Sequence, residues 1–306
     1  MLEIDEATTK LCQLAKDGQL IIFVGSGISI GSGLPKWDEF LEKFIEFCKE
    51  LRATYSKYPE VQSIFSDTLL NDAARQTRSH PTHVATVLKE RMAALPSRIS
   101  TNVEKDFKRW FFKLFSDAEP NAQHHWIAST NYPYILTSNY DILLEDAAKA
   151  VGAPYASISF YEKGLIAETL YNQTPAIIHV HGTAYDAVLD KVVFTSEDYI
   201  RIIKKGEPGF SFALQSLFLR YSTLFVGYGA SDPHLEDLME EFAYFFDFED
   251  SEHMSKNYLV VLREKAQTIL DAYKKRMRTE LIVIDDFRQY ESLLKKINLA
   301  SPRSVR

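Results

Sequence analysis

Two hydrophobic patterns recur along the chain, and they predict strands and helices respectively. Short apolar runs, typical of strands buried on both faces of a parallel sheet, lie at 20–24, 134–137, 155–160, 176–180, 192–194, 224–226, 258–262 and 281–284. Apolar residues spaced by three or four positions indicate helices at 4–18, 37–51, 60–78, 81–94, 102–116, 121–129, 140–150, 196–204, 209–221, 233–246, 264–277 and 287–297. Since strands and helices alternate over most of the chain, we predict an α/β fold with a doubly wound, Rossmann-like parallel sheet.

One long stretch between the first two predicted strands has no strand pattern. Residues 52–130 contain only predicted helices punctuated by prolines, and proline suits the first turn of a helix. The chain of 306 residues is long enough for one large domain. We therefore predict a single domain over residues 1–300 with a helical insertion at 52–130, followed by a flexible tail at 301–306.

Composition narrows the class of protein. The net charge of −7 argues against direct nucleic-acid binding, because such binding relies on Lys and Arg contacts to phosphates. Cys12 and Cys48 are too few for a disulfide framework or a four-cysteine zinc site, so we expect free thiols in a reducing cytosol. The chain shows no signal-peptide layout and no apolar run near the ~18 residues that a membrane span needs. We expect a cytoplasmic protein without membrane contact.

Four glycines follow the first predicted strand within a short segment, at Gly25, Gly27, Gly31 and Gly33. Glycine lets a backbone approach a pyrophosphate closely, and the N–H groups at the start of the next helix attract anions. This layout favours a phosphate-binding turn, with a tight turn that binds no ligand as the open alternative. The glycine spacing differs by one residue from the dinucleotide fingerprint, and no Gly-Lys-Ser/Thr follows. Neither an ordinary Rossmann dehydrogenase nor a Walker-type ATP site is therefore predicted.

Four predicted strands end in glycines or polar side chains. These ends are 25–29 (Gly-Ser-Gly-Ile-Ser), 137–141 (Thr-Ser-Asn-Tyr-Asp), 179–182 (His-Val-His-Gly) and 227–232 (Gly-Tyr-Gly-Ala-Ser-Asp). Open parallel sheets bind ligands outside the carboxyl ends of their strands. We therefore expect all four segments to line one site.

The four segments, in this order, resemble the motifs of the sirtuin family. That family carries Gly-Ala-Gly-Ile-Ser…Ser-Gly-Ile-Pro, Thr-Gln-Asn-Ile-Asp, His-Gly and Gly-Thr-Ser. The matching segments here are Gly25–Pro35, Thr137–Asp141, His181–Gly182 and Gly227–Gly229. Pro120–His124 also looks like the start of a family helix. The resemblance covers most of the chain and implies a sirtuin-type sheet that binds NAD+.

Departures from the family pattern indicate a subgroup. Classical sirtuin deacylases carry a four-cysteine zinc module between His-Gly and Gly-Thr-Ser, but no cysteine lies between His181 and Gly227. No zinc module and no metal site are therefore expected. The family's arginine after Gly-Ile-Pro is missing from Lys36–Asp38, and Tyr140 replaces the family's isoleucine. These features are similar to bacterial sirtuin-like NAD hydrolases of anti-phage systems, which include Thoeris effectors, defence-associated sirtuins and partners of HerA-type ATPases.

This resemblance implies an NAD+ glycohydrolase that cleaves NAD+ to nicotinamide and ADP-ribose, which depletes NAD in an infected cell. It also implies a restraint on a destructive activity, either homo-oligomerisation or a separate partner such as a HerA-like ATPase. Two alternatives stay open. One is an NAD-dependent protein deacylase, against which the missing zinc module and arginine argue. The other is a catalytically silent subunit that senses NAD or scaffolds a partner.

The resemblance also implies roles for individual residues. Asn139 is expected to position the attacking water or the ribose hydroxyls, because an amide both donates and accepts. His181 is expected to act as general base or as partner of a ribose hydroxyl, and an imidazole suits a base at neutral pH. Asp141 is expected to hold the nicotinamide carboxamide. The full set of expected NAD+-binding residues is Gly25, Ser26, Gly27, Ser29, Pro35, Trp37, Ser138, Asp141, Gly227, Tyr228, Gly229 and Asp232.

The polar residues in these segments also have ordinary structural interpretations. Asn139 can be a turn residue or a helix cap. Asp141 and Asp232 can be charges in the first turn of a helix, where they are favourable. His179 shares a strand face with His181, and it either supports that residue or packs in the core.

Overall fold

The computed structural model describes residues 1–186, 191–200, 208–228, 255–273 and 279–303. Within them, eight parallel strands form one sheet in the order β1-β8-β7-β6-β2-β3-β5-β4. The strands are β1 (Leu2–Glu3), β2 (Leu20–Val24), β3 (Tyr134–Thr137), β4 (Ala156–Ser159), β5 (Ala176–His179), β6 (Ser222–Val226), β7 (Asn257–Leu262) and β8 (Thr279–Ile284). The predicted parallel sheet is confirmed. The additional strand β1 is too short to show a pattern in the sequence.

Helices lie in the described connections between the strands. The described helices are α1 (Ile4–Lys16), η1 (Ser26–Ser32), α2 (Trp37–Thr54), α3 (Pro59–Ile64), α4 (Asp67–Gln76), α5 (Pro81–Ala93), α6 (Ser97–Ser116), α7 (Ala122–Ala128), α8 (Leu143–Ala150), α9 (Lys163–Asn172), η2 (Ala184–Asp186), α10 (Ser196–Ile200), α11 (Pro208–Arg220), α13 (Arg263–Tyr273) and α14 (Phe287–Ala300). The helix predicted at 60–78 is divided, because the Ser66 hydroxyl accepts the N–H of Leu69 and caps α4 separately. The sequence pattern does not predict α9, and the helix predicted at 233–246 lies outside the described residues.

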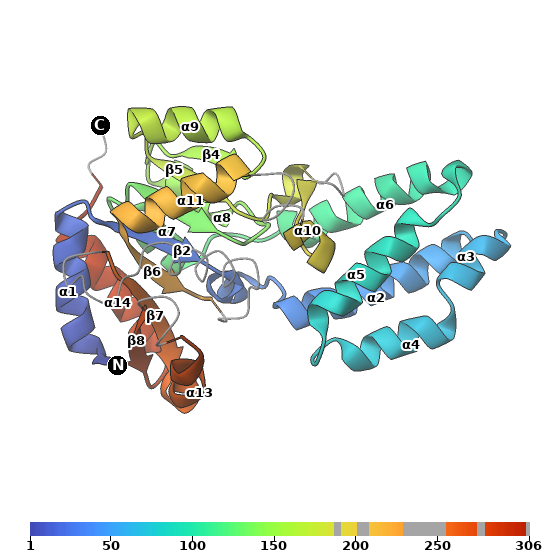
Figure 1. Ribbon diagram of the computed structural model, residues 1–306, viewed down its shortest axis with the longest axis horizontal. Helices are drawn as coiled ribbons and strands as arrows, with labels where there is room; N and C mark the ends of the chain where they lie inside the picture. Colours follow the sequence, from blue (N-terminus) through green and yellow to red (C-terminus); the bar gives the residue numbers. More distant parts are fainter. Residues whose placement is uncertain (187–190, 201–207, 229–254, 274–278, 304–306) are drawn as a thin grey trace.

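The apolar run of β2 is buried because helices cover both faces of the sheet (Figure 1). Leu20, Ile22 and Val24 pack with α1, α7, α8 and α14 on one face. Ile21 and Phe23 pack with α9, α11 and α13 on the other face. Successive side chains of a strand point to opposite faces, so a run that is apolar throughout places β2 inside a doubly wound sheet.

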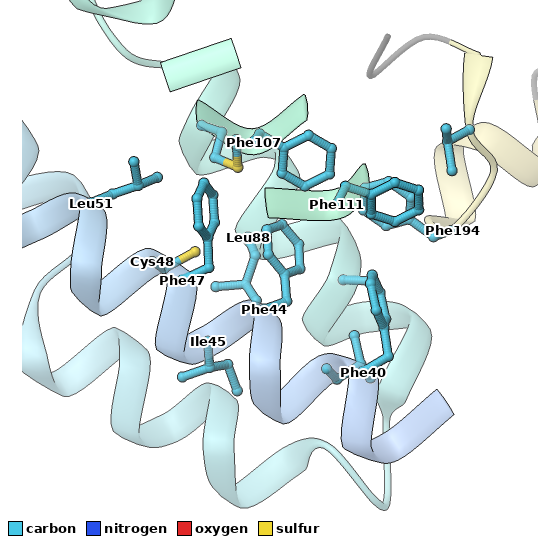
Figure 2. Packing of buried hydrophobic residues seen from close by; sticks show 14 of the residues in the cluster. Phe40, Phe44, Ile45, Phe47, Cys48, Leu51, Leu88, Phe107, Phe111 and Phe194 are labelled. Atoms are coloured by element: carbon cyan, nitrogen blue, oxygen red, sulfur yellow. The ribbon is translucent and has the colours of Figure 1, made fainter. Parts of the chain in front are cut away.

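Helices α2 to α6 (residues 37–116) form a bundle, the helical lobe, that extends from one side of the sheet in Figure 1. Its core is aromatic, and Figure 2 shows Phe44 and Phe47 of α2 facing Phe107 of α6. The rings of Phe44 and Phe107 lie 5.6 Å apart between centroids. The lobe begins with α2, before the predicted insertion at 52–130, whereas α7 packs on α8 and α14 beside the sheet. The domain division itself stays a prediction, and α2 to α6 are the helical unit that packs together.

Two aromatic side chains link the lobe to the loops that follow the strands. Tyr140, after β3, joins the aromatic core of the lobe and donates its hydroxyl to the Val193 carbonyl at 2.6 Å. Phe194 packs against Phe107 with ring centroids 6.2 Å apart. The segment 192–194, predicted as extended, forms no strand and instead carries these buried contacts. The loops after β3 and β5 are therefore tied to the lobe.

A largely buried ion pair also binds Phe194 and Thr195 to the lobe. Lys89 Nζ of α5 lies 2.7 Å from Asp198 Oδ1 of α10. The other carboxylate oxygen of Asp198 accepts the N–H groups of Phe194 and Thr195. A single carboxylate thus fixes the segment between β5 and α10 to the lobe.

The last described residues pack on the body of the protein. The Ser301 hydroxyl donates to the Ala15 carbonyl at 3.1 Å, and the Arg303 N–H donates to the Ser129 carbonyl at 2.8 Å. The tail predicted to be flexible at 301–306 therefore differs from the structure over residues 301–303, which hydrogen bonds hold in place.

The free thiols expected from the sequence are present. Cys12 is half-buried on α1, and Cys48 is buried in the helical lobe, where burial raises the pKa of its thiol. Among the described helices, none combines the length and the apolar character needed to cross a membrane.

Candidate functional site

The candidate site lies at the carboxyl edge of the sheet, where the connections diverge around β2. This strand is flanked by β6 on one side and β3 on the other, and such a switch point leaves room for a ligand. A cavity of about 170 Å³ lies there. On the sheet side its lining residues are Gly25, Ser26, Ser29, Ser138, Asn139, Tyr140, Asp141, His181, Gly227 and Tyr228. From the segment after η1 and from helices α2, α5 and α6 they are Leu34, Pro35, Lys36, Trp37, Phe40, Pro81, Thr82 and Phe115.

Most residues expected at the site from the sequence meet at this cavity. Gly27 lies next to the lining, against Gly227, while Gly229 and Asp232 are outside the described residues. Tyr140 belongs to the segment 137–141 that was expected at the site, and Leu34 lies within the motif Gly25–Pro35, although neither was assigned a contact with NAD+. The lining residues outside the predicted motifs are Lys36, Phe40, Pro81, Thr82 and Phe115, and those from the lobe reach the cavity through tertiary packing alone.

The glycines after β2 are explained by contact with the turn after β6. The N–H of Gly25 donates to the Val226 carbonyl at 2.8 Å, and the N–H of Gly27 donates to the Gly227 carbonyl at 2.9 Å. A Cβ on Gly25 would lie 2.6 Å from the Gly227 oxygen. A Cβ on Gly227, whose φ is +61°, would lie 2.6 Å from the Ile28 nitrogen. The N–H groups of Gly25 and Gly27, expected to cradle phosphates, are thus engaged within the protein.

Asn139 is buried and is held through all of its hydrogen-bonding atoms except one. Its N–H donates to Thr137 Oγ1 at 3.1 Å, and its carbonyl accepts His179 Nδ1 at 3.1 Å. Its side-chain Nδ2 donates to Ser29 Oγ at 3.0 Å and to the Gly25 carbonyl at 3.4 Å. Within the described part of the chain, its Oδ1 has no hydrogen-bond partner. The amide therefore has one unused acceptor on a residue that lines the cavity.

His124 forms hydrogen bonds with both Ser29 and Asn121. His124 Nδ1 accepts the N–H of Asn121 at 3.2 Å, so the neutral ring carries its proton on Nε2 and donates it to Ser29 Oγ at 3.3 Å. Burial lowers the pKa of His124 to about 4, which keeps the ring neutral near pH 7. For Asn121 and His124, the only signal in the sequence was the resemblance of Pro120–His124 to the start of a family helix.

Asp141 is a buried carboxyl group beside the cavity. Burial raises its pKa to about 6, against the opposing effects of the Leu143 N–H, the Ser29 hydroxyl and the charge of His179. The Leu143 N–H, at the start of α8, donates to Asp141 Oδ1 at 3.2 Å. The two sequence interpretations are therefore compatible, because Asp141 lines the cavity and also accepts a backbone N–H at the start of α8.

His179 is fully buried at the end of β5. Its Nδ1 lies 3.1 Å from the Asn139 carbonyl oxygen, and its Nε2 lies 2.7 Å from Glu145 Oε1. The Ser157 hydroxyl donates to the same oxygen of Glu145 at 2.7 Å. These contacts show that His179 supports Asn139, whereas the sequence analysis considered support of His181 or packing in the core.

His181 follows β5 and borders the cavity. Its carbonyl accepts the Val193 N–H at 3.0 Å. Gly182, with φ of +77°, has no room for a Cβ, which would lie 2.2 Å from the Lys191 carbonyl oxygen. The chain after β5 is therefore pressed against the segment that begins at Lys191, and this packing holds His181 at the cavity.

The lining combines polar groups with aromatic side chains of the lobe. Among the polar groups, Asn139 offers a carbonyl acceptor, His181 an imidazole and Asp141 a carboxyl group, while Trp37 and Phe115 belong to the helical lobe. A mostly apolar cavity with a few placed polar groups is typical of small-molecule sites. Across the described residues, no group of three or more His, Cys, Asp and Glu side chains is arranged to hold a metal ion.

Comparisons with known proteins agree with the motifs. Residues 133–282 match the model of a family described as SIR2-like domain. Over 241 residues, or 76% of this chain, the sequence is 24% identical to defense-associated sirtuin 2 of Bacillus subtilis. That match covers 20% of the relative, so this chain spans about a fifth of the relative's length. A Sir2 structure with deacetylated p53 peptide and 3′-O-acetyl ADP-ribose aligns with 94% of this chain and 96% of its own, at 15% identity and a TM-score of 0.42.

Proposed function

Because this chain is a sirtuin-like protein with a SIR2-like domain, we propose that it hydrolyses NAD+ to nicotinamide and ADP-ribose. A water oxygen bonds to the anomeric carbon of the ribose, and nicotinamide leaves with the electrons of the broken bond. The departing ring is cationic in the substrate and becomes neutral, so it needs no acid, while one proton leaves the attacking water. The similarity to a defence-associated sirtuin supports a role in anti-phage defence through NAD depletion.

The observation that carries this proposal is the unused carbonyl oxygen of Asn139. An acceptor at that place orients a water or a ribose hydroxyl by taking one of its hydrogens, and placement of the reacting groups lowers the barrier. Contacts of Nδ2 with Ser29 and Gly25 hold the amide, and its buried Oδ1 is left without a partner among the described residues. Asn139 is therefore proposed to act directly on the attacking water or on the ribose.

Other lining residues supply the remaining proposed contacts. His181 accepts the proton of the attacking water, directly or through a ribose hydroxyl. Asp141 accepts a hydrogen from the nicotinamide carboxamide. Ser26 is the proposed phosphate contact in the first turn, because the N–H groups of Gly25 and Gly27 are already engaged. The other proposed NAD+ contacts are Ser29, Pro35, Trp37, Ser138, Gly227, Tyr228, Gly229 and Asp232.

The direct test is incubation of the purified protein with NAD+, with nicotinamide and ADP-ribose followed by chromatography. Asn139→Ala and His181→Ala are each expected to lower kcat by at least about 100-fold, in the range of lost acid–base and positioning effects. Asn131→Ala and His125→Ala, away from the cavity lining, serve as matched controls and should retain turnover.

Other outcomes separate the alternative functions. O-acyl-ADP-ribose formed from an acyl-lysine peptide would support a deacylase. NAD+ binding without turnover, alone and with proteins encoded next to this one, would support a silent sensing or scaffold subunit and contradict the proposed hydrolysis.

We propose further that homo-oligomerisation or a separate partner, such as a HerA-like ATPase, restrains this activity. A hydrolase that destroys NAD requires such control, and this argument supports the proposed restraint. Turnover should change when the purified protein is diluted below its assembly concentration or mixed with a neighbouring-gene ATPase. Equal turnover per site under all these conditions would contradict regulation by assembly.

A further inference from the structure

Both ring nitrogens of His179 face oxygen acceptors. Nδ1 lies 3.1 Å from the main-chain carbonyl oxygen of Asn139, and Nε2 lies 2.7 Å from Glu145 Oε1. A neutral imidazole has one N–H, so one of its nitrogens would direct a lone pair at an oxygen lone pair. With Glu145 ionised, both contacts are favourable only when the ring is an imidazolium. The hydroxyl of Ser157 favours that ionised state by donating to the same oxygen of Glu145.

The surroundings of His179 determine when this imidazolium exists. On the adjacent strands, the residues in register with it are Thr137 and Ser159, which do not titrate. The charged groups that face it are Glu145 of α8 and Asp141 in the loop before that helix. Burial alone would lower the pKa of His179, but these two carboxylates and the bond to the main-chain carbonyl raise it overall. The proton is therefore retained above the usual pH range of histidine.

We propose that His179, held as an imidazolium by Glu145, is a positioning residue that fixes the main chain of Asn139, and that loss of its proton at alkaline pH disables the site. This inference rests on the proposed hydrolysis, in which Asn139 orients the attacking water. A neutral ring keeps only one of the two bonds, and the negative charge of Glu145 favours the proton on Nε2, so the Asn139 carbonyl loses its donor and Oδ1 is displaced. Other substrate contacts persist, so kcat falls more than KM rises.

Glu145→Gln tests the charge while it preserves a hydrogen-bond acceptor. The glutamine oxygen still accepts Nε2–H, but the negative charge that stabilises the imidazolium is gone. The alkaline limb of the pH profile of kcat should move to lower pH by roughly one to three units, the usual effect of removing a close opposite charge. Exposed Glu168 on α9 provides the control Glu168→Gln, which should leave the profile in place. An unmoved alkaline limb in Glu145→Gln would overturn the proposal.

Substitutions of His179 test the contact with Asn139. In His179→Asn, the amide nitrogen takes the place of Nδ1 and donates to the Asn139 carbonyl without titrating. This variant should keep a measurable kcat that no longer declines at alkaline pH, whereas His179→Leu should lose at least about 10-fold in kcat, the size of a lost positioning effect. An alkaline limb unchanged in His179→Asn would contradict the assignment. Circular dichroism identifies any variant that fails to fold.

A separate readout distinguishes failure of this inference from failure of the proposed function. Nitrogen NMR of the His179 ring in the wild-type protein should show two protonated nitrogens at pH 7.5, and Glu145→Gln should show one. This measurement needs no turnover. If NAD+ is not hydrolysed, the proposed function fails by itself. A singly protonated wild-type ring would overturn the imidazolium assignment whether or not NAD+ is cleaved.

Discussion

Asp141 and His179 are both buried ionisable residues with raised pKa values, but the causes differ. Burial raises the pKa of Asp141 to about 6, so the native state disfavours its carboxylate. Its contribution to stability is therefore lost as pH rises from the unfolded value of 3.8 through that pKa. Burial opposes the charge of His179, and its neighbours overcome that effect. The stability from this imidazolium is present below the unfolded pKa and is lost as pH rises through the raised one.

The carboxylate of Asp141 gives the proposed hydrolysis a predictable acid limb. If the ionised group accepts a hydrogen from the carboxamide, kcat/KM for NAD+ should fall as pH decreases below about 6, where Asp141 takes up a proton. Initial rates from pH 5 to 8 measure this limb. Asp141→Asn should lower kcat/KM and remove the limb, while Asp146→Asn, a control in the first turn of α8, should preserve it. A limb that persists in Asp141→Asn would assign it to another group.

Single residues were predictable where a strand end carried a motif. Asn139, Asp141 and His181 were found in this way, because the carboxyl ends of parallel strands meet at one edge. His124 and Glu145 were not assigned roles, since each acts on the site through a residue that lies distant in the chain, Ser29 for His124 and His179 for Glu145. No periodicity in a sequence encodes such a pairing.

At the scale of elements, the helical lobe is positioned by a short segment without secondary structure. Phe194 is buried in the lobe, and the Lys89–Asp198 pair holds the same segment to α5 and α10. Apolar spacing predicted the lobe helices, but it gave one helix over 60–78 where the structure has α3 and α4. The Ser66 cap that begins α4 is a local feature that apolar spacing does not reveal. Spacing also gave no sign that 192–194 would be buried in a helical core, which tertiary packing decides.

Lys89 is expected to contribute strongly to stability. Lys89→Met leaves the charge of Asp198 buried without its cation, and this should lower the free energy of unfolding by about 3 kcal/mol. Urea denaturation followed by tryptophan fluorescence measures the loss. Lys49→Met provides the control, since the Lys49–Glu46 pair is exposed and should cost less than about 0.5 kcal/mol. Equal effects of the two substitutions would show that the buried pair is not a special contact.

At the scale of the whole molecule, the cavity depends on two turns that contact each other backbone to backbone. The turn after β2 donates two hydrogen bonds to the end of β6 and the turn that follows it, from the Gly25 N–H to the Val226 carbonyl and from the Gly27 N–H to the Gly227 carbonyl. The sequence analysis related Gly25 and Gly27 to a phosphate, because glycine-rich turns after a strand commonly bind one, and it expected Gly227 only as a contact of NAD+. Their closeness to each other is a property of strand order, and the apolar runs do not specify that β6 lies beside β2.

Gly227→Ala tests this contact. Its Cβ would lie 2.6 Å from the Ile28 nitrogen at a φ of +61°, so we expect a loss of at least about 2 kcal/mol in the free energy of unfolding. Gly18→Ala is a matched control, because Gly18 has a φ of +64° and nothing within 4 Å of the added Cβ. That control should cost only about 1 kcal/mol from backbone strain. Similar losses in chemical denaturation would attribute the effect to φ alone.

The contact between these turns also sets the order of events during synthesis. Gly25 and Gly227 are about 200 positions apart in the chain, so the ribosome must release β6 before the turn after β2 has its partner. Contacts between distant segments slow folding, because a long loop must close before they form. A growing chain therefore carries an unfinished cavity until β6 has been made. For an enzyme proposed to destroy NAD+, this topology delays activity until the strands on both sides of β2 are present.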